Sequence, residues 1–218
     1  MRFADAADRL ATLPSPLPAG RVELLPVFTD GRLRPRLVPT SSARPAAVLV
    51  LVFADGAGDA RLVLTERLSY DGHHSGEVSF PGGKAEPSDG GDPAATALRE
   101  AEEEIGLRRS DGGLAISGVL DEIYIPVSDF RITPVVAVAD GALSQLVPHP
   151  GEVARILTPP VDAFLPDAPI ELAERTAGDW PIRYGGFRID GLHVWGATAR
   201  ILGQLGAILA GGDSQPHA

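Results

Sequence analysis

Three glutamates lie close together in the segment 94–105 and could bind a metal ion. Glu100, Glu103 and Glu104 have the spacing i, i+3 and i+4, so on a helix they fall within an arc of roughly 100°. Carboxylates crowded in this way repel one another. Hard oxygen ligands at this density suit Mg²⁺ or Mn²⁺ better than zinc. Without a cation, the same pattern would be a solvated acidic face.

A glycine-rich loop with further polar residues precedes the three glutamates. Gly82 and Gly83 carry no Cβ, so their backbone N–H groups can approach a metal ion or a phosphate closely. Lys84 follows them, and Glu86 and Asp89 come next. Loop, helix and carboxylates together favour a phosphate-and-metal site.

This whole segment resembles a known sequence motif. Residues 82–107, GGKAEPSDGGDPAATALREAEEEIGL, resemble the Nudix box, G-x5-E-x7-R-E-U-x-E-E-x-G-U. The second half of the pattern matches in full from Arg99 to Leu107. In the first half Gly83 matches the box glycine, Asp89 occupies the position of the first glutamate, and nine residues instead of seven separate Asp89 from Arg99. The extra residues fall in the loop, where added length costs little.

The segment before the box resembles one branch of that family, the coenzyme A pyrophosphatases. It reads LVLTERLSYDGHHSGEVSFPGGK, and the pattern of the branch runs roughly LLTxR and then HxGE/Q-V-S/A-FPGG. Tyr70-Asp71-Gly72 stands where the branch often has a Leu-Arg pair. Later pieces, SDFRITPVVAV, PGEVARILTPPVDAFL and HVWGATARIL, are also similar to the branch, so the resemblance spans about 46–202. The residues that fit the flank are Thr65, Arg67, His74, Gly76, Glu77, Val78, Phe80, Pro81, Gly82 and Gly83.

The resemblance implies a metal-dependent enzyme that hydrolyses the pyrophosphate bond of coenzyme A or its derivatives. The products would be 3',5'-ADP and 4'-phosphopantetheine, or the acylated form of the latter. Mg²⁺ or Mn²⁺ would neutralise the linked phosphates and activate water. One box glutamate or a remote carboxylate would serve as general base.

The resemblance also implies roles for individual residues. Arg99 would pair with Glu86 or Asp89 and thereby brace the loop. A late carboxylate would complete the metal site, and Glu152 is our candidate, with Asp121 and Glu122 as competitors. The catalytic residues would be Glu100, Glu103, Glu104 and Arg99; the metal ligands Glu100, Glu103, Glu104 and Glu152; the substrate-binding residues Arg67, His74, Gly82, Gly83 and Lys84.

Two other functions remain open at this point. The same chemistry could act on another nucleoside diphosphate derivative, such as ADP-ribose or NADH, because the box itself would look alike. A non-catalytic module that binds a nucleotide and regulates a partner belongs to a different class. Such a module would be expected to lose ligand carboxylates, whereas this chain keeps all three.

Local signals predict the elements that position these residues. Asp92-Pro93 is typical of a helix start and Gly106 of a helix end. A short helix is expected at Asp5–Leu13 and a final amphipathic helix at Gly196–Leu209. His193 and Trp195 precede that last helix and are expected to be packing residues. Strands are expected at 46–54, 61–67, 76–83, 114–125 and 130–140 and at the start of 152–165, with a Gly-rich hairpin turn at 55–59 and a strand pair around Gly185-Gly186 at 182–189.

The order of these elements predicts an α+β fold, specifically a Nudix-type α/β/α sandwich with a mixed β-sheet and a catalytic loop-helix. Residues 1–45 are expected to form an N-terminal extension packed on the domain. Residues 46–210 would be the Nudix hydrolase domain, and 211–218 a flexible tail.

Composition excludes several other classes of protein. The 218 residues are 44 % hydrophobic and carry a formal net charge of −10, which argues against disorder and against a general nucleic-acid binder. The chain has no cysteine, which excludes disulfide scaffolds and thiolate zinc sites. No apolar run reaches the ~18–20 residues of a membrane helix. We therefore expect a cytoplasmic protein with a small nucleotide substrate, and leave open whether it forms a homodimer.

Overall fold

The centre of the molecule is a six-stranded mixed sheet. A computed structural model describes the chain except for residues 33–37, 69–75, 142, 144, 178–179 and 212–218. Strands β2 and β9 pair in parallel, and every other pairing in this sheet is antiparallel. The turn between β2 and β3 is the predicted hairpin. The strands are β2 (Arg44–Ala54), β3 (Ala60–Leu62), β6 (Gly82–Lys84), β7 (Ala115–Val119), β8 (Ile123–Ile125) and β9 (Phe130–Ala139).

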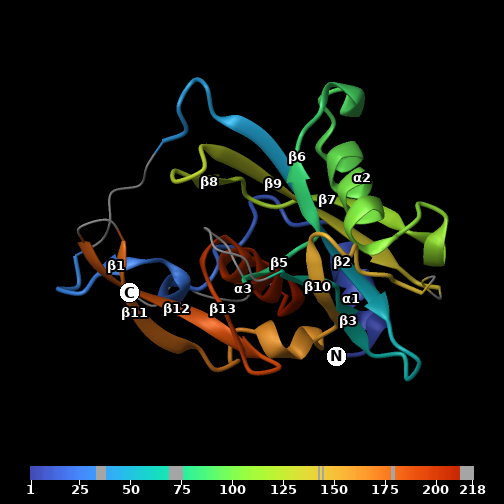
Figure 1. The fold of residues 1–218 in the computed structure, drawn as a ribbon. Coiled ribbons are helices and arrows are strands. Elements are labelled where there is room, and N and C mark those ends of the chain that lie inside the picture. The colour runs from blue at the N-terminus through green and yellow to red at the C-terminus, as the bar shows by residue number, and fades with distance from the viewer. Residues whose placement is uncertain (33–37, 69–75, 142, 144, 178–179, 212–218) are drawn as a thin grey trace.

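Helices cover both faces of this sheet, because successive side chains of a strand point to opposite faces. Leu49 and Leu51 of β2 pack with helix α2 (Pro93–Ile105). Val50 and Val52 belong to the second core cluster, which includes α1 (Phe3–Leu10) and α3 (Gly196–Leu209). Figure 1 shows α2 on one side of the sheet and α1 and α3 on the other. The predicted α/β/α sandwich with a mixed sheet is confirmed.

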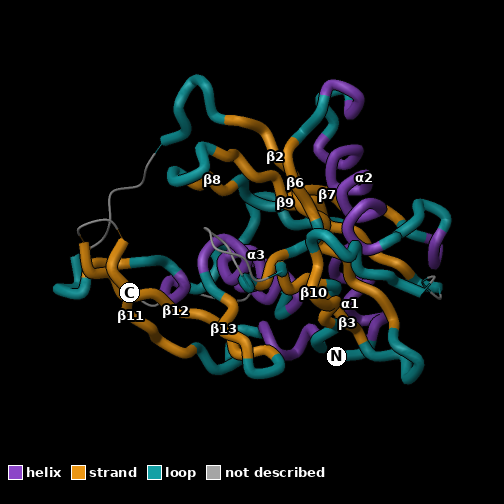
Figure 2. The backbone as a smooth tube through the Cα atoms, in the orientation of Figure 1, coloured by secondary structure: helices purple, strands orange, loops and turns teal. Residues whose placement is uncertain are grey.

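Two smaller sheets flank this sandwich (Figure 2). Both are antiparallel, and one joins the strands that precede and follow the segment 68–77, which contains His74. The other forms the left-hand side of Figure 1. The first contains β4 (Leu64–Arg67), β5 (Val78–Ser79) and β10 (Val153–Leu157); the second contains β1 (Val27–Phe28), β11 (Glu171–Ala177), β12 (Trp180–Ile189) and β13 (Leu192–Val194); the short 3₁₀ helices are η1 (Val22–Leu24), η2 (Pro87–Asp89), η3 (Asp111–Gly113) and η4 (Val161–Phe164).

Four of the expected elements were wrong. The strand expected at 76–83 is two strands in different sheets, β5 and β6. The strand expected at 61–67 is two strands in different sheets, β3 and β4, separated at Val63, and the one expected at 114–125 is divided into β7 and β8. Gly185 and Gly186 make no turn but lie inside β12. A Cβ at Gly186 would stand 2.5 Å from the carbonyl oxygen of Val194, so glycine serves close strand approach there rather than chain reversal.

The terminal segments differ from expectation in detail. The first helix begins and ends earlier than expected, at Phe3 and Leu10. Helix α3 has the expected bounds but is not amphipathic, since residues 201–209 are all buried between the sheets. The division into an extension, a domain and a tail stays a prediction. No helix among the described residues is long and apolar enough to cross a membrane.

Candidate active site

Helix α2 has the caps that the sequence predicted. The Asp92 carboxylate accepts a hydrogen bond from the backbone N–H of Ala94 at 2.9 Å, and Pro93 occupies the first turn. Gly106 ends the helix in the left-handed conformation, which glycine adopts without strain. The helix packs on β2 and β6. The caps therefore fix which residues of α2 face the glycine pair in β6.

Glu104 is a buried carboxylate, with only 5 % of its surface exposed. The backbone N–H of Gly82 lies 3.3 Å from its Oε2 atom. The pKa of Glu104 is raised to about 7, chiefly by burial and also by the charges of Glu100 and Glu152, while the Gly82 N–H and the charge of Arg67 act in the opposite direction. Such excess negative charge in a partly dry site is the setting in which a cation binds favourably.

Glu100 lies directly over Gly83. A Cβ built on Gly83 would stand 2.5 Å from the Cδ atom of the Glu100 side chain, closer than non-bonded atoms approach. The absence of a side chain at this position therefore makes room for the carboxylate. Burial raises the pKa of Glu100, and Glu103 and Glu152 act in the same direction.

Glu103 has a different setting from the other two glutamates. Its side chain is 58 % exposed, and its Oε2 atom lies 3.1 Å from the NH1 group of Arg99. Among the described residues, no group of three or more acidic or histidine side chains is drawn together tightly enough to hold an ion. Glu104 is thus the buried carboxylate of the predicted metal site, and Glu103 lies at its solvent edge. Glu100 lies between them in exposure, at 16 %, and its Oε1 atom is 3.0 Å from the same NH1 group of Arg99.

Arg99 braces the loop through Asp89, and this decides between the two partners that the sequence left open. Its Nε and NH2 groups donate to the two carboxylate oxygens of Asp89 at 2.9 and 3.1 Å. Asp89 also accepts from the N–H of Glu86 and from the hydroxyl of Thr96, both at 2.8 Å. A second donation runs from Arg99 to the Lys84 carbonyl oxygen at 2.9 Å. The arginine therefore ties α2 to the loop before it.

Thr96 is a functional contact that sequence reasoning missed. It is buried, with 1 % exposure, and it lies within the longer interval that separates Asp89 from Arg99. An aspartate is one methylene shorter than the glutamate of the motif. The Thr96 hydroxyl and the Glu86 N–H hold this shorter carboxylate within reach of Arg99. No local sequence signal marks a threonine in a helix as such a partner.

We expect Asp89→Asn to lower the melting temperature at neutral pH, by an amount that shrinks steadily as the pH falls below about 4. Arg99, first among several donors, holds the pKa of Asp89 well below its usual range. A lowered folded-state pKa stabilises the fold above the ordinary aspartate value, about 3.9, and this contribution is lost as pH falls through the folded value. Thermal melts of both proteins from pH 7 to pH 2 measure it. A constant difference across that range would contradict the prediction.

We expect Arg99→Lys to lower kcat by roughly tenfold or more while leaving the fold intact. An ammonium group cannot reproduce the planar two-point contact with Asp89. Steady-state kinetics of the single variants and of the double variant with Asp89→Asn give the coupling between the two positions. Additive losses would show that the pair does not act as a unit.

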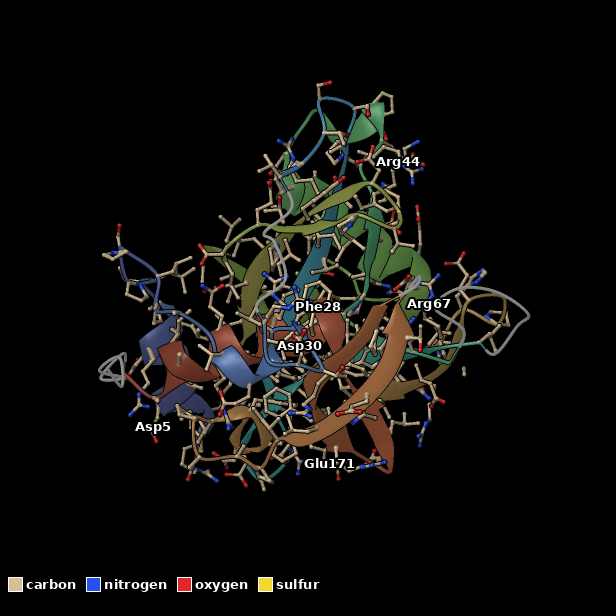
Figure 3. The ribbon with its side chains drawn as sticks, turned by 90° about the vertical axis from the view of Figure 1, so that its left-hand side faces the viewer. Asp5, Phe28, Asp30, Arg44, Arg67 and Glu171 are labelled. Atoms are coloured by element: carbon tan, nitrogen blue, oxygen red, sulfur yellow. The ribbon has the colours of Figure 1, made fainter. Side chains whose placement is uncertain are left out.

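The predicted substrate-binding residues Arg67, Lys84 and His74 differ in how the structure places them. Arg67 ends β4, and its charge lowers the pKa of Glu104, so it stands near that buried carboxylate. Figure 3 labels Arg67 above and to the right of Glu171, the first residue of β11. The Lys84 side chain is exposed at the rim. His74 lies outside the described residues, as does His73.

Glu152 is the late acidic residue that the structure brings near the box glutamates. Its charge acts on both Glu100 and Glu104. The two competitors have partners elsewhere: Asp121 accepts from the Gln204 amide at 2.6 Å, and Glu122 pairs with Arg131 at 3.3 Å. The role of Glu152 as a metal ligand stays a prediction, now with a position that suits it.

The loop that carries Glu152 is attached to the end of α2 by backbone hydrogen bonds. The N–H of Val147 donates to the carbonyl oxygen of Ile105 at 2.9 Å. The N–H of His149 donates to the carbonyl oxygen of Glu104 at 2.8 Å. These bonds place the loop beside the very turn that holds the buried glutamate.

The model of the NUDIX domain family matches residues 43–177, which include the β2–β9 pair, the glycine pair, helix α2 and Glu152. The chain belongs to the Nudix family.

Relatives of this Nudix protein include named enzymes. It is 40 % identical over 162 residues to Nudix hydrolase 15, mitochondrial, of Arabidopsis thaliana, covering 72 % of this chain and 55 % of that one. It is 34 % identical over 184 residues to the human mitochondrial coenzyme A diphosphatase NUDT8, covering 80 % and 74 %. The chain spans about half the length of the first relatives it matches.

Solved structures support the fold alone. The crystal structure of a MutT protein from Methanosarcina mazei Go1 matches with a TM-score of 0.50 at 13 % identity. The match covers 80 % of this chain and all of that one. The shared part is therefore the Nudix architecture, and the sequence has diverged on it.

Proposed function

We propose that this Nudix hydrolase cleaves the diphosphate bond of coenzyme A or a coenzyme A derivative, giving 3',5'-ADP and (acyl-)4'-phosphopantetheine. The observation that carries the proposal is the pair of carboxylates over the glycines of β6, the buried Glu104 and the half-buried Glu100, with Arg67 near Glu104. The flank that contributes Arg67 is the segment that resembles the coenzyme A branch. Two relatives with coenzyme A diphosphatase in their names, human NUDT8 and mouse NUDT7, are 34 % and 39 % identical.

The residues present fit divalent metal ions, which enzymes of this family generally use. The carboxylates of Glu100 and Glu104 offer oxygen ligands to a metal ion. Their negative charges repel each other, and the charge of Glu152 adds to that repulsion. Mg²⁺ and Mn²⁺ prefer such ligands. When bound, the ions neutralise charge on the diphosphate and favour attack by water.

The chain itself would position the substrate for that attack. Arg67 binds a diphosphate oxygen, since a guanidinium matches phosphate geometry. Arg99 ties α2 to Asp89 of η2 and to the Lys84 carbonyl oxygen of β6, so the carboxylates stay in place. Glu152 and Glu103 are the two carboxylates exposed enough to accept a proton from water.

A substrate panel tests the proposal. The purified protein is incubated with coenzyme A, acetyl-coenzyme A, ADP-ribose and NADH, with Mg²⁺ or Mn²⁺, and the products are identified by mass. We expect coenzyme A or its thioester to give the highest kcat/KM and 3',5'-ADP as a product. Faster turnover of ADP-ribose or NADH would replace coenzyme A with another nucleoside diphosphate derivative.

A further inference from the structure

An aromatic cluster with an arginine lies on the sheet formed by β11, β12 and β13. The Tyr184 and Trp195 rings are 5.0 Å apart at 46°. The guanidinium of Arg175 lies over the Trp195 ring, 4.7 Å from its centroid, and the His193 ring meets Tyr184 edge-on at 5.8 Å. We call these four residues, Arg175, Tyr184, His193 and Trp195, the aromatic shelf.

The shelf lies on one face of its sheet, the face that also carries Ile182, which is buried with 4 % exposure. Phe187, Ile189 and Val194 point the other way and are buried in the core with at most 4 % exposure. Tyr184 and Trp195 keep part of their surface exposed, and Arg175 is exposed. Trp195 packs against Tyr184 and Arg175, and the exposed parts of these three side chains are what a ligand would contact.

Arg175 differs from the other arginines of this sheet. Arg183 donates to Glu174 at 3.0 Å, and Arg188 donates to Glu171 at 3.1 Å. Within the described part of the chain, Arg175 has no carboxylate partner; its contact is the Trp195 ring. In a protein with a net charge of −10, an unpaired guanidinium held over an indole is a favourable place for an anion attached to a flat ring.

The shelf is connected to the catalytic segment through β5. Strand β13 packs against β5, and the Thr198 hydroxyl, just after Trp195, donates to the carbonyl oxygen of Val78 at 3.1 Å. Four residues lead from Val78 to Gly82, whose N–H meets Glu104. A chain of that length spans at most roughly 13 Å. One elongated substrate held at the carboxylates could therefore extend to the strand on which the shelf rests.

We propose that the aromatic shelf binds the 3'-phosphoadenosine end of the substrate, with the adenine ring against Tyr184 and Trp195 and the 3'-phosphate on Arg175. This inference rests on the proposed function. It assigns the two arginines different duties: Arg67, beside Glu104, serves the diphosphate, and Arg175 serves the 3'-phosphate. Aromatic rings accept any base by stacking, so the arginine supplies the preference for a nucleotide phosphorylated at the 3' position.

Tryptophan fluorescence of the full chain tests the proposal without catalysis. The chain has two tryptophans, and Trp180→Phe leaves Trp195 as the single reporter. With a chelator present, 3',5'-ADP is titrated and compared with 5'-AMP and 4'-phosphopantetheine. We expect 3',5'-ADP to change the emission and to bind more tightly than 5'-AMP. Arg175→Ala should weaken 3',5'-ADP binding by roughly ten- to a hundredfold and leave 5'-AMP binding nearly unchanged.

Arg183→Ala is the matched control, since it removes an exposed arginine from β12 that is already paired with Glu174. Equal 3',5'-ADP affinities in the Arg175→Ala and Arg183→Ala proteins would overturn the inference. So would 3',5'-ADP that inhibits coenzyme A hydrolysis without altering Trp195 emission. If Arg175 governs 3',5'-ADP binding but coenzyme A is not hydrolysed, the shelf stands and the proposed function falls.

Discussion

Glu104→Gln is expected to lower kcat by two orders of magnitude or more, and also to raise the stability of the metal-free protein at pH 8. Glutamine keeps the size of the side chain and an oxygen that can accept from the Gly82 N–H. It loses the charge that a divalent ion would need. Steady-state kinetics with saturating Mg²⁺ measure the first effect, and thermal or denaturant unfolding with a chelator measures the second.

The sign of the stability change follows from the raised pKa. A carboxyl group whose pKa moves from 4.5 to about 7 on folding favours the fold while protonated, and loses that contribution as pH rises through 7. At pH 8 the buried charge costs up to about 3 kcal/mol, which Gln avoids. At pH 4 the two proteins should be alike. Glu102→Gln is the control, because Glu102 is exposed on the same helix.

Two results would contradict this expectation. Near-normal turnover of a folded Glu104→Gln protein would remove Glu104 from the site. Lower stability of that variant at pH 8 would show that the carboxylate is held by contacts stronger than its burial cost. Double variants with Glu100→Gln or Glu103→Gln should lose less than the sum of the single losses, because ligands of one ion act as a unit.

Gly83→Ala is expected to reduce kcat by about a hundredfold or more with little change in KM for the substrate. The added methyl group would occupy the space in which the Glu100 carboxylate lies, 2.5 Å from its Cδ atom. Glu100 must then rotate away, and a metal ligand moves with it. Metal-dependence curves should show a higher Mg²⁺ or Mn²⁺ requirement. Misplacement of a catalytic group by about 1 Å is enough for a loss of this size.

Gly56→Ala is the matched control for that variant. Gly56 lies in the turn between β2 and β3, and a Cβ there would meet nothing within 4 Å. Its kinetics should equal those of the parent protein. Full activity and metal affinity of the Gly83→Ala protein would contradict the prediction. Glu100 would then bind its ion from another rotamer, and its position over Gly83 would not matter for function.

The bounds of helix α2 could be predicted from the sequence because the residues that start and end a helix act locally. Asp92, Pro93 and Gly106 act within one turn of the helix ends, so no distant contact can easily override them. The central strands β2 and β9 were predictable for a related reason: both faces of the sheet are covered, and the strands read as continuous apolar runs.

Predictions from local sequence were wrong where strand pairing with distant parts of the chain decides the structure. Nothing near Val63 signals that the chain leaves one sheet and enters another, since that change depends on which distant strands are available, β2 for one half and β10 for the other. Gly185 and Gly186 carry the usual turn signal, and the reason for them, close approach of another backbone, exists only in three dimensions.

The candidate site shows the same division. The spacing of Glu100, Glu103 and Glu104 could be read from the sequence, but not that Glu104 is buried while Glu103 is exposed. The choice of Asp89 over Glu86 as the partner of Arg99 depends on the path of the loop, and the part played by Thr96 depends on that path as well. Each of these distinctions is a matter of solvent access or of loop geometry.

The attachment of the Glu152 loop to α2 has a consequence for how the sequence of this protein can diverge. Both bonds join main-chain atoms, Val147 to Ile105 and His149 to Glu104, and every residue except proline supplies the donor. Side chains at these positions are therefore free to drift under mutation, so the loop can acquire new substrate contacts without moving Glu152. Insertions are another matter. Added residues before 147 would leave the attachment unchanged, whereas any added between 149 and 152 would carry the late carboxylate away from the box glutamates.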